Sequence, residues 1–326
     1  MNDRKTNIYI QGIGSYVPPK SVSNQDLSKK VDTSDEWIFS HTGIKNRHIA
    51  SAEDSTSDLA VNAVNSLLEK CGLDKKAVGG IIVATATGDY PGFPSTACVI
   101  QDKLALDGIM AFDVAAGCTG FIYALNIAES LMAGSSLDNV LVIGAEKLSA
   151  VTDWSDRNTC VLFGDGAGVA LLSRRDDDYS CFVDSVLHAR GSGFDKLMIP
   201  SGGTKDKHGE ARNLYMDGRA VYTFAVRVVK DVIIELLERN NLTLDQIDWI
   251  VPHQANMRII QAAAKRLGID ESKFFMNIGQ YANTSAASIP IALNEMIENN
   301  LLERGMTIIT VGFGAGLTYG GNVIRW

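Results

Sequence analysis

The 326-residue sequence has no apolar run long enough to cross a membrane, and residues 1–14 contain no apolar core of a secretory signal. It also has no block of like charges. With 38 Asp and Glu against 30 Lys and Arg, the formal net charge is −8, which argues against a general nucleic-acid binder. We therefore expect a soluble, cytoplasmic protein that binds neither membranes nor nucleic acids.

Cysteine and aromatic residues are also few. The cysteines are odd in number and lack the spacing of metal ligands: Cys71, Cys98, Cys118, Cys160 and Cys181. This pattern favours reduced thiols over a disulfide framework. Aromatic residues make up 7% of the chain, although 46% is hydrophobic and 30 residues are glycine. That composition is typical of an α/β protein with many tight turns.

Continuous apolar runs alternate with segments of helical periodicity. The runs predict buried strands at 80–85 and 139–146, and the periodic segments predict helices at 57–71 and 218–240. Such alternation indicates a mostly parallel sheet that helices cover on both faces.

Two glycine-rich segments need interpretation. The GDGAG sequence at 164–168 runs into a strand, whereas a dinucleotide-binding fingerprint runs into a helix, so we predict an ordinary turn. The segment 190–216 is long, polar and irregular, and long loops in compact proteins often cover a site.

The two halves of the sequence repeat each other. Residues 111–128 resemble 275–296 in pattern, and 139–146 resemble 307–314, with nearly equal spacing between the paired segments. We therefore predict a duplication of βα units with halves at 1–175 and 176–326. Open sheets of this kind bind substrates outside the strand ends, where the two halves meet.

Cys118 lies at a predicted strand-to-helix turn, between small residues that would let a substrate come close. The free N–H groups and positive dipole end of the helix favour a thiolate there. A buried structural thiol is the alternative on this segment alone. His253 and Asn283 fall at equivalent turns of the second half, which favours Cys118 as a catalytic nucleophile over Cys118 as a structural thiol. Alone, His253 could be a structural hydrogen-bonder and Asn283 a helix cap.

The motifs that surround these residues resemble those of the β-ketoacyl-acyl-carrier-protein synthase III family. They are GCTGF, VPHQANMRII, GQYANTSAASIP and FGAGLTYG, together with DTSDEWI, HTGIKNRH and DRNTCVLFGDGAG. The resemblance runs nearly end to end in the right order. It implies the duplicated thiolase fold, a five-layered αβαβα architecture, and usually a homodimer that starts bacterial fatty-acid synthesis.

The implied reaction condenses acetyl-CoA or another short acyl-CoA with malonyl-acyl carrier protein (malonyl-ACP). Cys118 would carry the acyl group, and the backbone N–H groups of Cys118 and Ala315 would hold the oxyanion. His253 and Asn283 would donate hydrogen bonds to the enolate oxygen left by decarboxylation. No metal and no redox cofactor is implied.

The resemblance also implies binding residues. Coenzyme A would contact Trp37, Arg157, Asn256 and His41, with the adenine between Trp37 and Arg157. The acidic ACP would dock on a basic segment made of Gln254, Ala255, Asn256, Met257, Arg258, Lys265 and Arg266. The alternative interpretation of this segment is an ordinary solvated helix face. The acyl pocket would be lined by Phe93, Leu148, Phe163 and Leu214.

Two positions depart from the pattern of the family. His41 stands where many relatives carry an arginine near the CoA phosphates, and Thr223 replaces a lysine often used for ACP docking. Three other functions remain open: a related enzyme of secondary metabolism with a longer primer, a papain-like thiol hydrolase with the same Cys-His-Asn order, and a binding module without catalysis.

Overall fold

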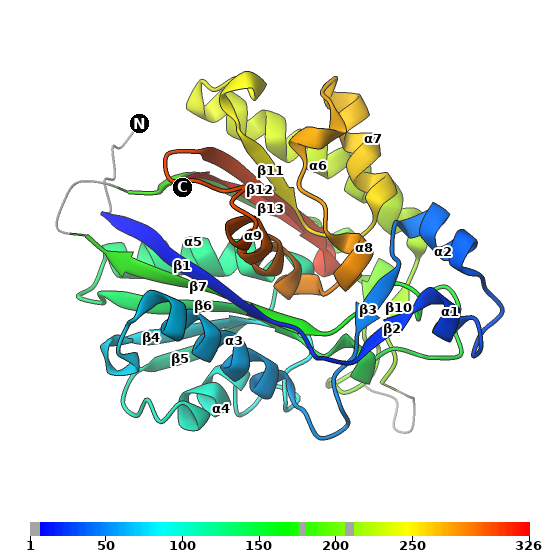
Figure 1. Cartoon of the computed structure of the whole chain (residues 1–326), viewed down its shortest axis with the longest axis horizontal. Helices are drawn as coiled ribbons and strands as arrows, with labels where there is room; N and C mark the ends of the chain where they lie inside the picture. The colour runs from blue at the N-terminus through cyan, green and yellow to red at the C-terminus, as the bar shows by residue number, and fades with distance from the viewer. Residues whose placement is uncertain (1–6, 176–179, 206–211) are drawn as a thin grey trace.

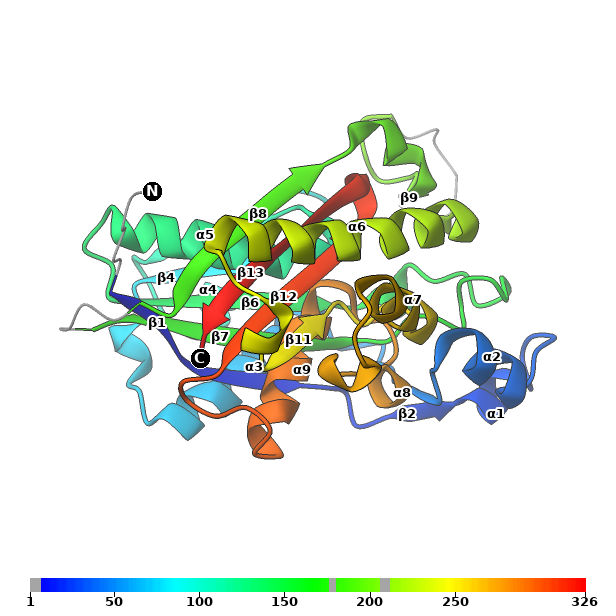
Figure 2. The same cartoon turned by 90° about the horizontal axis from the view of Figure 1, so that it is seen from above.

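The computed structural model describes residues 7–175, 180–205 and 212–326. Two mixed β-sheets form its framework (Figures 1 and 2). The first sheet has the order β1-β7-β6-β4-β5 and the second the order β8-β13-β12-β11. Their strands are β1 (Ile8–Tyr16), β4 (Gly80–Ala84), β5 (Met110–Val114), β6 (Asn139–Glu146), β7 (Gly166–Arg174), β8 (Phe182–Ala189), β11 (Trp249–Pro252), β12 (Thr307–Gly314) and β13 (Thr318–Arg325).

Six helices cover the two sheets and complete five layers. One outer layer packs on the first sheet, a middle pair lies between the sheets, and another outer layer packs on the second sheet. In that order the helices are α3 (Thr56–Cys71) and α4 (Thr96–Lys103), α5 (Gly120–Ala133) and α9 (Ser288–Glu298), and α6 (Gly218–Asn240) and α7 (Met257–Leu267). Three apolar cores fill the spaces between these layers.

The topology of one half repeats in the other. β1-α3-β4-α4-β5-α5-β6-β7 in the first half corresponds to β8-α6-β11-α7-α9-β12-β13 in the second. An isolated parallel bridge between Ile250 and Phe274 stands where a fifth strand would lie. The predicted boundary between residues 175 and 176 borders on residues outside the described part of the chain, and it stays a prediction.

The prediction of a mostly parallel sheet is wrong. The parallel pairs are β4–β5, β4–β6 and β11–β12, whereas β1–β7, β6–β7, β12–β13 and β8–β13 are antiparallel. The apolar runs arise because helices bury both faces of each sheet, and that burial gives the same pattern in an antiparallel strand.

Short elements surround one end of the sheets. They are β2 (Ser21–Ser23), α1 (Asn24–Leu27), α2 (Asp35–Thr42), β3 (Asn46–His48), β9 (Leu197–Met198), β10 (Tyr215–Met216) and α8 (Ile278–Tyr281). Short 3₁₀ segments lie at Lys75–Ala77, Gly117–Thr119, Leu148–Ala150, Gly191–Lys196, Leu244–Gln246, Glu271–Lys273, Ser285–Ala287 and Ala315–Leu317.

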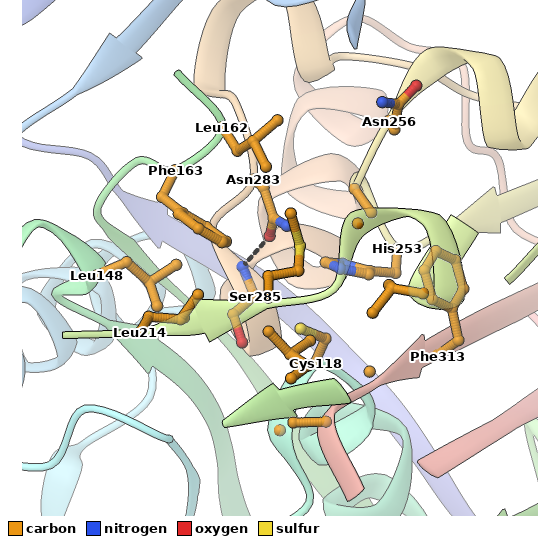
Figure 3. Close-up of a pocket in the computed structure, with 18 of the residues that line it drawn as sticks. Cys118, Leu148, Leu162, Phe163, Leu214, His253, Asn256, Asn283, Ser285 and Phe313 are labelled. Atoms are coloured by element: carbon orange, nitrogen blue, oxygen red, sulfur yellow. Dashed lines mark hydrogen bonds between the residues drawn. The ribbon is translucent and has the colours of Figure 1, made fainter. Parts of the chain in front are cut away.

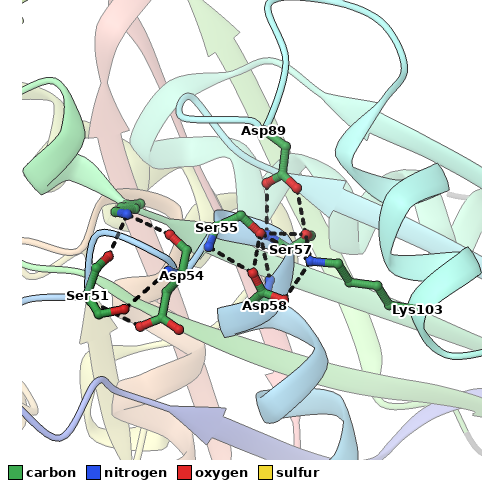
Figure 4. Close-up of polar contacts among 8 residues, drawn as sticks. Ser51, Asp54, Ser55, Ser57, Asp58, Asp89 and Lys103 are labelled. Atoms are coloured by element: carbon green, nitrogen blue, oxygen red, sulfur yellow. Dashed lines mark hydrogen bonds and ion pairs between the residues drawn. The ribbon is translucent and has the colours of Figure 1, made fainter.

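A polar network fixes the start of α3 and the loop that follows β4 (Figure 4). Ser55 and Asp58 form a capping box at the N-terminus of α3. Asp89 accepts hydrogen bonds from the backbone N–H of Ser57 at 3.0 Å and from its hydroxyl at 2.6 Å. Lys103 of α4 forms an ion pair with Asp58 at 2.6 Å. The network therefore joins α3, α4 and the loop that leads toward the cavity.

Candidate active site

A cavity of about 340 Å³ lies where the two halves meet at the end of the strands. Cys118, His253 and Asn283 all line it, and Figure 3 shows their side chains facing this space. Each comes from a turn between a strand or bridge and a helix, so the repeat brings together residues that are far apart in sequence. Most of the remaining lining is apolar.

Cys118 lies in the 3₁₀ turn Gly117–Thr119 that leads into α5. Cys118 lines the cavity, and burial raises the pKa of its thiol to about 11. The Ser285 side chain and the backbone N–H groups of Cys118 and Ala315 act in the opposite direction and favour the thiolate. Burial outweighs these donors, so the resting side chain is a neutral thiol.

Close backbone approach explains two glycines beside Cys118. A Cβ at Gly314 would lie 2.8 Å from both the backbone N and the Cβ of Cys118. Gly117 has a φ of +52°, and a Cβ there would lie 3.2 Å from the N of Ala315. These contacts bring the predicted oxyanion donors, the N–H groups of Cys118 and Ala315, to the same point beside the sulfur.

Asn283 is held in a strained backbone turn. Its N–H donates to the O of Leu162 at 2.9 Å, and its O accepts from the N–H of Gly164 at 3.0 Å. Two non-glycine residues beside it, Ala282 and Ser285, have positive φ angles of 57° and 48°. Such conformations cost about 1–3 kcal/mol each and concentrate at functional sites.

The amide orientation of Asn283 follows from one hydrogen bond. Its Oδ1 accepts from the backbone N–H of Ser285 at 2.8 Å. Since an N–H can only donate, the carbonyl side of the amide must face that group. The Nδ2 group is then free to donate to a molecule in the cavity.

His253 follows β11 and is 1% exposed. Burial lowers its pKa to about 3, so the ring is neutral at pH 7. Its Nδ1 lies 2.7 Å from Oγ of Ser288, and the edge of its ring meets the Phe313 ring at a centroid distance of 5.4 Å. These two contacts fix the orientation of the ring.

Glu146, at the end of β6, is a fully buried carboxyl group that does not line the cavity. Burial raises its pKa, while hydrogen bonds from Thr87 Oγ1 at 2.5 Å and from the N–H of Ala86 at 3.1 Å act to lower it. The Ser285 side chain lowers its pKa as well. Glu146 thus holds the loop after β4 through these hydrogen bonds and also interacts with the Ser285 side chain.

The predicted acyl-pocket residues divide into two groups. Leu148, Phe163 and Leu214 line the cavity and belong to an apolar cluster that also includes Leu162 and Ile199. Phe93 does not line the cavity within the described residues of its own chain, so its place in the acyl pocket stays a prediction. Its side chain is 88% exposed because it lies in the Pro- and Gly-rich loop between β4 and α4, which projects outward.

The four residues expected at coenzyme A lie together. His41 stacks on Trp37 at a centroid distance of 4.5 Å, and Arg157 lies over the Trp37 ring at 4.6 Å. At this distance no space is left between the Arg157 guanidinium and the Trp37 ring for an adenine. Asn256 lines the cavity, where its Nδ2 donates to the O of His41 at 3.0 Å.

The predicted ACP surface is smaller than expected. Gln254 is 1% exposed, and its amide binds the backbone of Pro252, Phe275 and Asn277. It therefore holds the core together and cannot dock a partner, so that prediction is wrong. Met257 is half-buried against the cluster beneath α2, and Ala255 lines the cavity.

The cations Arg258, Lys265 and Arg266 are exposed on α7. Arg258 also donates through Nε to the O of Ser40 at 2.8 Å. The described part of α7 therefore presents a positive surface beside the cavity mouth.

Several lining residues were not singled out from the sequence. Ser285 lies within the ANTSAAS motif and Phe313 lies within FGAG, so the motifs contained them. The motifs do not show which side chains face the cavity, because consecutive residues of a 3₁₀ turn or a strand point to different sides. For Leu162, Met198 and Ile199, which also line the cavity, the sequence shows only that the side chains are apolar, and this does not distinguish a pocket residue from a core residue.

Two other features are absent from the described residues. None of their helices is long and apolar enough to span a membrane. No three His, Cys, Asp or Glu side chains among them converge as metal ligands would.

Comparisons with known proteins agree with the geometry. Residues 112–191 match the family model 3-Oxoacyl-[acyl-carrier-protein (ACP)] synthase III, and residues 237–326 match the model of its C-terminal part. The chain is 48% identical over 323 residues to beta-ketoacyl-[acyl-carrier-protein] synthase III of Caldanaerobacter subterraneus subsp. tengcongensis, covering 97% of both chains.

Solved structures give the same result. The crystal structure of 3-oxoacyl-[acyl-carrier-protein] synthase III from Aquifex aeolicus is 43% identical, with a TM-score of 0.91 over 98% of this chain and 100% of that one. The priming β-ketosynthase of the R1128 polyketide pathway is 33% identical, with a TM-score of 0.90 over 97% and 95%. The expected thiolase-type fold is thereby confirmed, and the papain-like and non-catalytic alternatives are wrong. The chain belongs to the 3-oxoacyl-[acyl-carrier-protein] synthase III family, whose members are acyl-transferring condensing enzymes.

Proposed function

We propose that the chain condenses acetyl-CoA, or another short acyl-CoA, with malonyl-ACP to give 3-oxoacyl-ACP, CoA and CO₂, and so starts fatty-acid synthesis. The observation that carries this proposal is the convergence of Cys118, His253 and Asn283 on one largely apolar cavity. A thiol nucleophile, a neutral imidazole and an amide donor are the groups that such a condensation needs.

In the first half-reaction Cys118 attacks the thioester carbonyl of the acyl-CoA. The N–H groups of Cys118 and Ala315 stabilise the oxyanion, and CoA leaves with the proton that Cys118 gives up. Because the pKa of the thiol is about 11, the reacting thiolate is a minor species at pH 7, held by the donors that already surround the sulfur.

In the second half-reaction malonyl-ACP replaces CoA and loses CO₂. The electron pair moves onto the thioester oxygen, where His253 and the Nδ2 group of Asn283 donate hydrogen bonds. The enolate carbon then attacks acyl-Cys118, the new carbon–carbon bond forms, and the Cys118 sulfur is released. A neutral imidazole suits this role, and burial keeps the His253 ring neutral by lowering its pKa.

The binding of both substrates is supported by charge and shape. The acyl chain would enter the cluster of Leu148, Phe163 and Leu214, and pantetheine would pass Asn256. Adenine stacking on Trp37 requires Arg157 to move off the ring. ACP, an acidic protein, would meet Arg258, Lys265 and Arg266, with Arg227 and Lys230 of α6 as an extension.

We further propose a cytoplasmic homodimer that needs no cofactor. β5 ends the order of the first sheet, and all five of its residues are half-buried. Within the described residues its outer edge has no partner strand, so a second copy could extend the sheet there. The exposed Phe93 lies near this edge, because the N–H of Thr96 binds Asp113 of β5 at 2.7 Å.

A role in secondary metabolism is the second candidate. It is supported by the similarity to the priming ketosynthase, which is weaker at 33% identity than the 48% to a beta-ketoacyl-[acyl-carrier-protein] synthase III. Acyl-CoAs of increasing chain length, assayed with and without malonyl-ACP, distinguish the two. Highest kcat/KM for acetyl-CoA with malonyl-ACP supports the first candidate, and preference for a long primer or another acceptor contradicts it.

A further inference from the structure

Ser288, the first residue of α9, contacts the His253 ring. Ser288 is 2% exposed, and its hydroxyl oxygen lies 2.7 Å from Nδ1 of His253. The backbone N–H of Gln254 points at the same Oγ at 3.4 Å. The proposed condensation uses Cys118, His253 and Asn283 and gives Ser288 no part. Within the described residues, however, Ser288 forms the side-chain hydrogen bond to the His253 ring.

The direction of this hydrogen bond follows from what each group can do. The N–H of Gln254 can only donate, so Ser288 Oγ accepts from it. In the described part of the chain the remaining partner of the hydroxyl is Nδ1. If Nδ1 carried a proton, the serine hydrogen would be buried without an acceptor, which costs about 1–3 kcal/mol. Ser288 therefore donates, and Nδ1 carries the lone pair.

The protonation of the other ring nitrogen then follows. A neutral imidazole carries one hydrogen, and with Nδ1 unprotonated that hydrogen must be on Nε2. The ring lines the cavity, and burial keeps it neutral by lowering its pKa. Nε2 thus presents an N–H to the cavity and has no lone pair with which to accept a proton.

We propose that Ser288 is a positioning residue that holds His253 as the Nε2–H tautomer, making the imidazole a hydrogen-bond donor to the malonyl thioester oxygen and not a base for Cys118. This inference rests on the proposed condensation. It separates the two half-reactions. In acyl transfer the Cys118–acyl bond forms as the CoA–acyl bond breaks, and the thiol proton ends on CoA without passing through His253. Decarboxylation, in contrast, needs the Nε2 donor.

The kinetic test compares Ser288→Ala with the wild type in each half-reaction. We expect Ser288→Ala to lower kcat for condensation about 10–100-fold, less than the complete loss of an oxyanion donor, because the ring still samples the Nε2–H form. KM for malonyl-ACP and the rate of Cys118 acetylation should change less than about threefold. Ser288→Thr, which keeps the hydroxyl, should recover most of the activity.

A matched control separates this role from a general loss of stability. Ser173→Ala removes another buried hydroxyl, whose Oγ in β7 lies 2.7 Å from the side-chain amides of both Gln11 and Asn139 and does not line the cavity. It should leave both half-reactions unchanged. Nitrogen-15 NMR of labelled histidine, assigned with His253→Gln, should show Nε2–H in the wild type and a mixed or reversed tautomer in Ser288→Ala.

Two results would overturn the inference: a wild-type tautomer in Ser288→Ala with unchanged condensation, or equal losses of acetylation and condensation. If instead the wild type forms no acetyl-Cys118, the proposed function itself fails. The two failures are therefore distinguishable.

Discussion

At the scale of single residues, burial keeps the groups around the cavity neutral. The raised pKa of Cys118 and the lowered pKa of His253 have the same cause, the removal of bulk water. A condensation that develops negative charge on two oxygens in turn is served by neutral donors, which do not compete with the substrate for a counter-charge.

The pKa of Cys118 predicts how its reactivity depends on pH. Below a pKa of about 11 the thiolate fraction rises with pH, so alkylation by iodoacetamide should accelerate about tenfold per pH unit between roughly pH 7 and 10. The measurement uses peptide mass spectrometry in a Cys98→Ser background, because Cys98 is exposed. A rate that levels off below pH 8 would contradict the account.

His253 predicts a loss of stability in acid. Its pKa is about 3 in the folded protein, against an ordinary value of 6.5 for a histidine in the unfolded chain. Stability from its burial is therefore fully present above pH 6.5 and is lost as the pH falls toward 3, since the unfolded chain binds the proton first. At pH 4.5 the loss should be about 2–3 kcal/mol. Urea unfolding at pH 7 and 4.5 should show a smaller acid loss in His253→Gln, and equal losses would contradict this.

At the scale of elements, the strand-to-helix turns place the functional groups. Periodicity predicted β6 and α6 at the bounds that the structure has, because apolar runs and capping residues are local signals. The same signals located Cys118, His253 and Asn283 at turns. These local signals could not reveal that Gln254 is buried while nearby Arg258 is exposed, because irregular backbone between β11 and α7 separates the two residues.

The contact between β12 and the Cys118 turn gives a prediction for Gly314→Ala. The added methyl would meet the Cys118 backbone at 2.8 Å, so the turn must shift and the oxyanion donors with it. Removing one such donor costs about 10²–10³ in rate, and we expect a loss of at least tenfold in Cys118 acetylation. Gly191→Ala is the control, because its Cβ would meet no atom within 4 Å. Equal acetylation in both variants would show that the close approach is unimportant.

At the scale of the whole molecule, the duplication explains why one cavity draws on both halves. The sequence repeat predicted this meeting, but it could not predict the mixed direction of the strands. The antiparallel pairs β6–β7 and β12–β13 depend on short connections whose direction periodicity does not encode. The repeat also could not predict that Phe93 lies outside the cavity of its own chain.

The exposed edge of the first sheet predicts a dimer that depends on Phe93. A phenylalanine that is 88% exposed beside an open strand edge should be buried by a second copy. Sedimentation should show a dimer for the wild type and weaker association, at least about tenfold in Kd, for Phe93→Ser. Phe194→Ser, at an exposed site in the 3₁₀ turn Gly191–Lys196, should leave the dimer unchanged. A wild-type monomer, or equal effects of both variants, would contradict the proposal.

The most direct test of the account is the intact mass of the protein after incubation with acetyl-CoA. We expect the wild type to gain one acetyl group, to lose it when malonyl-ACP is added, and to release 3-oxoacyl-ACP. Cys118→Ser should gain no acetyl group, because a serine hydroxyl is a much weaker nucleophile in this neutral site. An acetyl adduct on both proteins, or on neither, would contradict the assignment of Cys118 as the acyl carrier.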